Sequence, residues 1–338
     1  MARIAHAERA TDEANGLSLT TKTFRRWAAP QTIMAVTNLF DEERLLLHAV
    51  KQAKQSSARV VLVHMIRADL VAAGFYRGAH GEEHAYTIQI AQAELDRMAR
   101  QLRWVGIHCE PIVIKDSPEE ELHRLVKEHG VDRVLVAMQG GRDGRKFSER
   151  AIAEEMLPAL GVPVCVIGRG VSPNSQKEKP AGRITLALSL RSDCEAPLGF
   201  ACRLAQEHHA HLTVMHVFGY RNRDSNIIDR TPMEVASRLP AEMLREAELQ
   251  CPLEITVREG DAASEILKYD ACTNQDFIVL GSPGAPSAVA SASASVVHRV
   301  VSEARCPVII LGQPAPVATR NPERPAASSR PRRIIRTG

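Results

Sequence analysis

The sequence predicts an α/β protein built from two tandem, doubly wound, Rossmann-like domains, each with a five-stranded parallel sheet. Three observations support this fold class. First, the 338-residue chain has the length of two average domains. Second, short continuous apolar stretches alternate with amphipathic stretches, as in a parallel sheet covered by helices on both faces. Third, the second half of the chain repeats the pattern of the first.

The repeat is visible in three pairs of matching segments. These pairs are residues 59–65 with 211–217, 131–136 with 275–280, and 161–168 with 305–312. The first pair is offset by 152 residues and the other two by 144, so the first half has the longer middle loop. Constant offsets within each block indicate an internal duplication.

Each half predicts five strands in the same order. They are residues 32–36, 59–65, 110–114, 133–137 and 164–167 in the first half, and 184–188, 211–217, 253–257, 277–280 and 308–311 in the second. Helices are predicted between them, the first at residues 41–55 and 196–208, and the third opening at Asp116 and Asp261.

The pattern sets the domain boundaries. Domains are predicted at residues 29–168 and 183–312, joined by a linker at 169–182 that is rich in Pro, Ser, Lys and Gly. Residues 1–28 lack strand patterning and are expected to be disordered or loosely docked. Residues 313–338, rich in Pro, Arg and Ser, are expected to form a basic disordered tail.

Composition argues against several kinds of partner. Aromatic residues are only 4% of the chain, so base stacking on single-stranded nucleic acid is not expected. The tail after residue 312 holds six arginines against one glutamate, which leaves the two domains near neutral and not suited to binding nucleic acid. No apolar run approaches the length of a membrane span, and the N-terminal residues show no secretory signal.

Cysteine usage indicates the compartment. The seven cysteines form no C-x-x-C motif, and several lie in apolar strand-like runs. An odd number of thiols in such positions is typical of reduced, buried cysteines. We therefore expect a cytoplasmic protein.

The second half carries a candidate phosphate site after its fourth strand. Gly281, Ser282 and Gly284 follow that strand, and Ser295 is expected to cap the helix that comes next. Glycines let a backbone approach a phosphate, and a helix N-terminus offers free N–H groups. The predicted nucleotide-binding residues are Gly281, Ser282, Gly284, Ser295 and Val296. The alternative is that the glycines only make a turn and Ser295 is only a cap.

This arrangement resembles the universal stress protein family, whose nucleotide-binding members carry G-x2-G-x9-G-[S/T] here. Gly281, Gly284 and Ser295 match, while Ala294 stands at the third glycine. The resemblance covers nearly all of residues 31–312 and implies ATP or another adenine nucleotide as the ligand. The family's aspartate after the first strand is replaced, by Thr37 in the first half and Ser189 in the second.

The first half departs further from the family pattern. Counting in register, Arg150 and Ala151 replace the third glycine and the serine, so this loop is predicted not to hold a phosphate. Its basic residues Arg142, Arg145 and Lys146 are expected to be solvated. The alternative is that they meet an anion held by the other domain.

The resemblance implies a stress-response regulatory protein and not an enzyme. No P-loop, G-x-S-x-G or G-x-G-x-x-G motif occurs at a position that would support catalysis. Two functions stay open: a nucleotide sensor that reports to a protein partner through its second domain, or a nucleotide-independent interaction protein. Gly281, Gly284 and Ser295 favour the former, whereas Ser189 and Ala294 favour the latter. Family members pair through their fifth strands, which implies that the two domains form an internal pseudo-dimer.

Histidines are the remaining candidates. His64 and His216 recur at equivalent strand positions, which favours a structural packing role. His208, His209 and His211 lie at a helix end without cysteine or carboxylate partners at ligand spacing. We expect them to face the last helix carbonyls rather than to bind a metal.

Overall fold

We analysed the fold in a computed structural model of the chain. The structure describes residues 29–37, 39, 42–66, 83–114, 118–138, 160–172, 182–190, 194–219, 231–281 and 288–311. Within these residues, no helix combines the length and the apolar character that crossing a membrane would require.

The first half alternates strands and helices as expected. Its elements are β1 (Thr32–Thr37), α2 (Glu42–Ser56), β2 (Arg59–Met65), α4 (Glu83–Trp104), β3 (Cys109–Ile114), α5 (Pro118–Glu128), β4 (Arg133–Ala137) and β5 (Val164–Ile167). β1, β4 and β5 are fully buried, so their side chains face packed helices or the other half on both sides of the sheet.

The second half repeats this order with one change. Its elements are β6 (Arg183–Leu188), α7 (Glu195–His208), β7 (His211–Phe218), α8 (Pro232–Arg238), α9 (Ala241–Gln250), β8 (Leu253–Glu259), α10 (Ala262–Thr273), β9 (Phe277–Gly281), α11 (Ala288–Glu303) and β10 (Val308–Leu311). Two short helices, α8 and α9, replace the single α4, because Leu239 is extended and Pro240 cannot continue the α8 hydrogen bonds.

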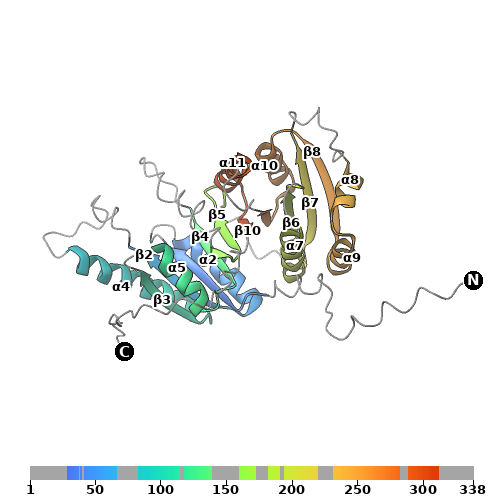
Figure 1. The fold of residues 1–338 in the computed structure, drawn as a ribbon. Helices are drawn as coiled ribbons and strands as arrows, with labels where there is room; N and C mark the ends of the chain where they lie inside the picture. Colours follow the sequence, from blue (N-terminus) through green and yellow to red (C-terminus); the bar gives the residue numbers. More distant parts are fainter. Residues whose placement is uncertain are drawn as a thin grey trace, which may run out of the picture.

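All ten strands form one sheet in the order β3-β2-β1-β4-β5-β10-β9-β6-β7-β8 (Figure 1). Strands run parallel within each half, while β5 and β10 pair antiparallel. Cys165 lies opposite Ile309, with Val166 opposite Val308 and Val164 opposite Ile310. Because Cys165 and Ile309 are equivalent residues of the two halves, this central pair lies on a pseudo-twofold axis. The predicted fold class is confirmed.

Helices cover both faces of the sheet, and each face forms one apolar cluster. Side chains of α2, α4, α7 and α9 pack on one face, including Leu45, Leu95, Leu198 and Met243. Side chains of α5, α10 and α11 pack on the other face. Both clusters contain residues from the two halves, so the hydrophobic core continues across the β5–β10 junction.

Candidate functional site

The second half has a topological switch point between β9 and β6. These neighbouring strands are parallel, and Ala187 lies opposite Leu280, so the strands end side by side at Leu188 and Gly281. The helix after β6, α7, packs on one face of the sheet, whereas the helix after β9, α11, packs on the other. Chains that diverge in this way leave a crevice at the carboxyl ends of the strands, where doubly wound proteins bind ligands.

The predicted nucleotide-binding residues fall partly at this crevice. Gly281 is the last residue of β9 and is half-buried. Ser282 and Gly284 lie outside the described residues. Ser295 and Val296 lie within α11, and Val296 packs against the apolar cluster of that face.

The expected helix start at Ser295 is wrong. α11 begins at Ala288, so Ser295 is inside the helix and not its N-cap. The Val296 N–H is therefore placed to bond a carbonyl one turn earlier rather than a phosphate. Ala294 is helical, and it is not among the described residues with a positive φ, so the backbone here does not require glycine. Nucleotide binding by Ser295 and Val296 stays a prediction, but one that requires a different start of α11.

Gly281 also has a structural reason to be glycine. A Cβ atom at this position would lie 3.1 Å from Cγ of Pro197, in the first turn of α7. The absence of a side chain thus lets α7 approach the end of β9 closely. This contact accounts for Gly281 whether or not a phosphate binds there.

The position of the family's aspartate needs a correction in the first half. Thr32 pairs with Arg59 in the first half, and Arg183 pairs with His211 in the second. In sequence, the separation between the two first strands is therefore one residue shorter than the separation between the two second strands. Thr37 consequently corresponds to Leu188. Asn38, not Thr37, is the counterpart of Ser189; it lies outside the described residues.

His64 and His216 secure the carboxyl ends of the first strands. Nδ1 of His64 lies 2.9 Å from the Thr37 carbonyl oxygen, and Nδ1 of His216 lies 3.1 Å from that of Leu188. Burial lowers the pKa of His64, although this hydrogen bond acts in the opposite direction. Both contacts support the structural role that their recurrence predicted.

An ion pair not foreseen from the sequence joins α10 to α11. Asp261 caps α10 as predicted, since its Oδ1 accepts the Ser264 N–H at 3.0 Å. Arg299 Nη1 donates to the same carboxylate oxygen at 2.7 Å, and Arg299 Nη2 donates to Ser264 Oγ at 2.9 Å. Hydrogen bonds from Ser264, with Arg299 adding to them, lower the pKa of Asp261. The Arg299 guanidinium thus links α11 to α10, and its Nε also lies 3.5 Å from Glu303 Oε1 within α11.

In the first half, an arginine contacts the ends of the fourth and fifth strands. Arg44, from the first turn of α2, donates to the carbonyl oxygens of Met138 and Gly168 at 3.1 and 3.0 Å. These carbonyls directly follow β4 and β5. The predicted loop residues Arg142, Arg145, Lys146, Arg150 and Ala151 lie outside the described residues.

Comparison with known proteins identifies the family. The model of the universal stress protein family matches residues 30–167 and again residues 181–312, which together make up most of the chain. This chain belongs to the universal stress protein family. The duplication seen in the sequence is thus a pair of universal stress protein domains.

Solved structures share the fold of this tandem universal stress protein. A universal stress protein from Archaeoglobus fulgidus DSM 4304 superposes with a TM-score of 0.64 at 16% identity, covering 84% of this chain and 98% of that one. A functionally unknown protein from Pseudomonas aeruginosa PAO1 gives 0.53 at 16% identity, covering 85% and 93%. The search of curated proteins finds no match.

His208 lies in the core of the second universal stress protein domain and not at the helix surface. Its ring packs edge-on against Phe277 with centroids 5.0 Å apart, and neither ring nitrogen has a hydrogen-bond partner in the part of the chain described. The expectation that it faces the last helix carbonyls is therefore wrong for His208. The carboxyl end of α7 is closed instead by His209 in the left-handed conformation. Among the described residues, no group of side chains could hold a metal ion.

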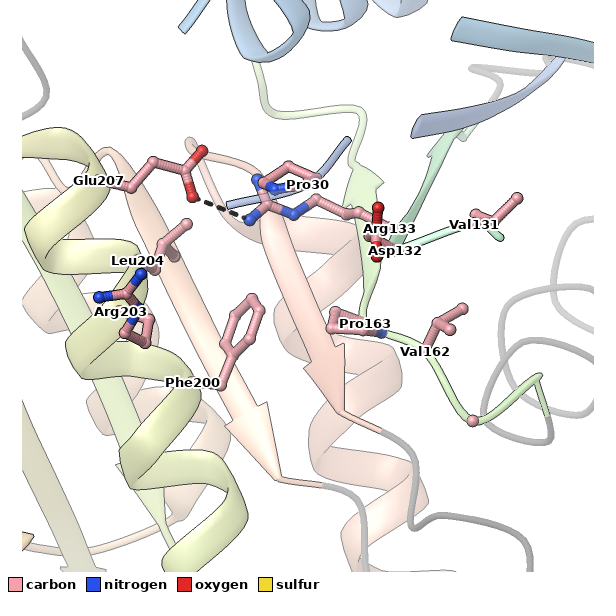
Figure 2. Close-up of a pocket in the computed structure, with 11 residues that line it drawn as sticks. Pro30, Val131, Asp132, Arg133, Val162, Pro163, Phe200, Arg203, Leu204 and Glu207 are labelled. Carbon is pink, nitrogen blue, oxygen red and sulfur yellow. Dashed lines mark hydrogen bonds and ion pairs between the residues drawn. The ribbon is translucent and has the colours of Figure 1, made fainter. Parts of the chain in front are cut away.

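The two universal stress protein domains also line a partly open pocket of about 190 Å³ beside the β5–β10 junction. Figure 2 shows Phe200 of α7 reaching toward Pro163 across this pocket, with Arg133 and Glu207 meeting at its rim. Arg133 Nη2 donates to Glu207 Oε2 at 3.2 Å. Sequence reasoning missed this contact, and its only sequence signal is an arginine at a strand position where the other half has Phe277.

Proposed function

We propose that this protein is a regulatory stress-response protein that binds ATP or a related adenine nucleotide in its second domain and performs no catalysis. The observation that carries the proposal is the divergence of α7 and α11 from the adjacent ends of β6 and β9. A crevice of this kind is where doubly wound domains hold nucleotides. Family membership supplies the stress-response context.

Within this crevice, we assign the nucleoside side to Ser189 and the phosphate side to Gly281, Ser282 and Gly284. Ser189 directly follows β6, next to the end of β9. Ser295 and Val296 would join the phosphate side only if the first turns of α11 unwound, freeing their N–H groups. Ligand binding would then be coupled to the length of α11, which gives a regulator a conformational signal to pass to a protein partner.

A second candidate function is a nucleotide-independent interaction protein. Two observations favour it: α11 already contains Ser295, and Gly281 is explained by its contact with Pro197. In this case the fold is retained as a scaffold and the crevice carries no ligand. In both cases we propose that the paired domains act as one internal pseudo-dimer, supported by the β5–β10 pairing. A cytoplasmic location fits the seven cysteines, all of which are free thiols.

The experiment that separates the two functions compares nucleotide binding by the wild type and by two variants. Calorimetry with millimolar ATP is combined with mass spectrometry of small molecules released by denaturing the purified protein. Ser189→Asp restores the family's carboxylate and is expected to strengthen binding. Ser295→Asp brings negative charge to the expected phosphate site and is expected to abolish binding. Ser237→Asp, on the exposed face of α8, adds the same charge elsewhere in the domain.

Wild-type binding that Ser295→Asp abolishes and Ser237→Asp preserves would support the sensor. If neither the wild type nor Ser189→Asp releases or binds nucleotide, the sensor proposal fails and the scaffold function remains. Binding that is unchanged in both Ser189→Asp and Ser295→Asp would place the nucleotide outside this crevice.

A further inference from the structure

The contact between the two domains contains a buried ion pair. Arg133, the first residue of β4, donates from Nη2 to Glu207 Oε2 at 3.2 Å and from Nη1 to Gln52 Oε1 at 2.9 Å. Only 4% of the Arg133 side chain and 10% of the Glu207 side chain are exposed. The Arg133 guanidinium also lies 5.8 Å from the ring centroid of Phe200. Each domain therefore contributes one member of this buried ion pair.

The pseudo-twofold axis gives each of these residues a counterpart. Arg133 pairs with Ile33 of β1, and Phe277 pairs with Ile184 of β6. Phe277 therefore occupies in the second domain the position that Arg133 occupies in the first. α2 and α7 end in equivalent left-handed residues, Ser57 with φ 56° and His209 with φ 53°. Counting back from these residues, Gln55 is the counterpart of Glu207 and His48 is the counterpart of Phe200.

These counterparts show what the other pairings would bring together. If two first domains paired through β5, each Arg133 would meet Gln55 and His48 of the other copy, with no carboxylate. If two second domains paired through β10, each Glu207 would meet Phe277 of the other copy in place of Arg133. Both arrangements separate a buried charge from the counterion that it meets in the observed pairing, which is unfavourable in a protein interior. Only the pairing of a first with a second domain brings Arg133 and Glu207 together.

We propose that Arg133 and Glu207 restrict each domain to the other type as its partner, so that the β5 surface of the first domain fits a second domain and excludes a second copy of itself. The apolar strands β5 and β10 would permit any of the three pairings, because both are short, buried and rich in Val and Ile. The ion pair supplies the discrimination that these apolar edges lack. This inference does not depend on whether the crevice binds a nucleotide.

The test separates the domains only after the full chain has folded. A protease site is introduced between residues 173 and 181, and the purified, folded protein is cleaved there. Native mass spectrometry is then recorded before and after prolonged incubation of the two fragments. The expected result is one first-domain fragment with one second-domain fragment, and no homodimer of either. The appearance of either homodimer, or complete separation of the fragments at micromolar concentration, would overturn the proposal.

Two variants of the cleavable protein test the role of the ion pair itself. Glu207→Gln leaves Arg133 buried without a counterion and is expected to weaken the association of the fragments roughly 100-fold. Glu265→Gln, which removes a charge paired with Lys268 within α10, is the matched control and is expected to change nothing. Equal association of the fragments in Glu207→Gln and in this control would contradict the proposal.

The double variant R133F/E207Q places in each domain the residue type found at the equivalent position of the other domain. No pairing then buries an unpaired charge, so homodimers of both fragments are expected beside the mixed pair. If the fragments of this variant still pair only with each other, the discrimination lies elsewhere and the proposal fails.

Discussion

Asp132 and Asp276 occupy the same position in the two domains and make the same two hydrogen bonds. Oδ2 of Asp132 accepts the backbone N–H groups of Gln31 and Thr32 at 2.8 and 3.0 Å. Oδ2 of Asp276 accepts those of Gly182 and Arg183 at 2.7 and 3.0 Å. Each aspartate, placed just before the fourth strand, thus fixes the start of the first strand of its domain.

We expect Asp132→Ala and Asp276→Ala each to lower the free energy of unfolding by about 1.5–3 kcal/mol, because each removes charge-assisted hydrogen bonds to two N–H groups. Urea denaturation measures this change. Asp96→Ala is the control: within the described part of the chain, Asp96 accepts one hydrogen bond, from the Gln92 amide one turn away on α4, so its loss should change stability by less than about 0.5 kcal/mol. Equal effects at all three positions would contradict the strand-fixing role.

Gly168, directly after β5, lies against the last turn of α11. A Cβ atom at Gly168 would be 2.2 Å from the Val301 carbonyl oxygen, a backbone atom that cannot move aside by rotating a side chain. Gly168→Ala is therefore expected to destabilise the protein by about 1–3 kcal/mol in urea denaturation. Gly182→Ala is the matched control, since a Cβ there would meet nothing within 4 Å. An equal loss of stability in both variants would show that the contact between Gly168 and α11 does not exclude a side chain.

The strands were predictable from the sequence because they are short, continuous apolar runs. β2, β4, β5 and β10 begin and end at the predicted residues, and the other strands differ from prediction by one or two residues at one end. The repeat also predicted correctly that the second strands carry His64 and His216. Burial on both faces leaves little choice of residue type in such strands, so the pattern is strong.

The start of α11 and the register of the first strand were not predictable in the same way. The segment from Ala288 to Ser295 contains only small residues and Val289, so it lacks the periodic apolar positions that mark a helix. Its alanines nevertheless favour helix, and the helix extends back to Ala288. Thr37 corresponds to Leu188 and not to Ser189 because the two halves differ in length by one residue in the loop between the first strand and the first helix. The matched histidine blocks lie beyond this loop and cannot reveal it.

The ion pair between Arg133 and Glu207 could not be predicted because it depends on how the domains meet. A charged residue at the start of a strand or the end of a helix is usually solvated. Arg133 is buried because α7 of the other domain and Gln52 of α2 in its own domain both lie against its side chain. The partner is 74 residues away in the sequence, and the only signal is that Arg133 stands where the other half has Phe277, which does not identify Glu207.

Two buried histidines are expected to make the protein sensitive to acid. Burial lowers the pKa of His208 to about 3, with Arg133 and Lys51 contributing repulsion. Burial likewise lowers the pKa of His48 to about 4, with repulsion from Lys51 and Arg44. Below the unfolded pKa of about 6.5, the unfolded chain binds protons that the folded protein cannot bind. Stability is therefore complete above pH 6.5 and falls as the pH drops toward these folded values.

His208→Leu tests this expectation, because leucine fills a similar volume without a titrating group. Each histidine contributes a slope of about 1.4 kcal/mol per pH unit, so the variant should lose stability more slowly than the wild type between about pH 6 and pH 4. It should be no less stable at neutral pH, since it removes two buried nitrogens that lack partners among the described residues. Urea denaturation across this pH range gives both slopes. Parallel pH profiles for the two proteins would show that His208 is protonated equally in the folded and unfolded states.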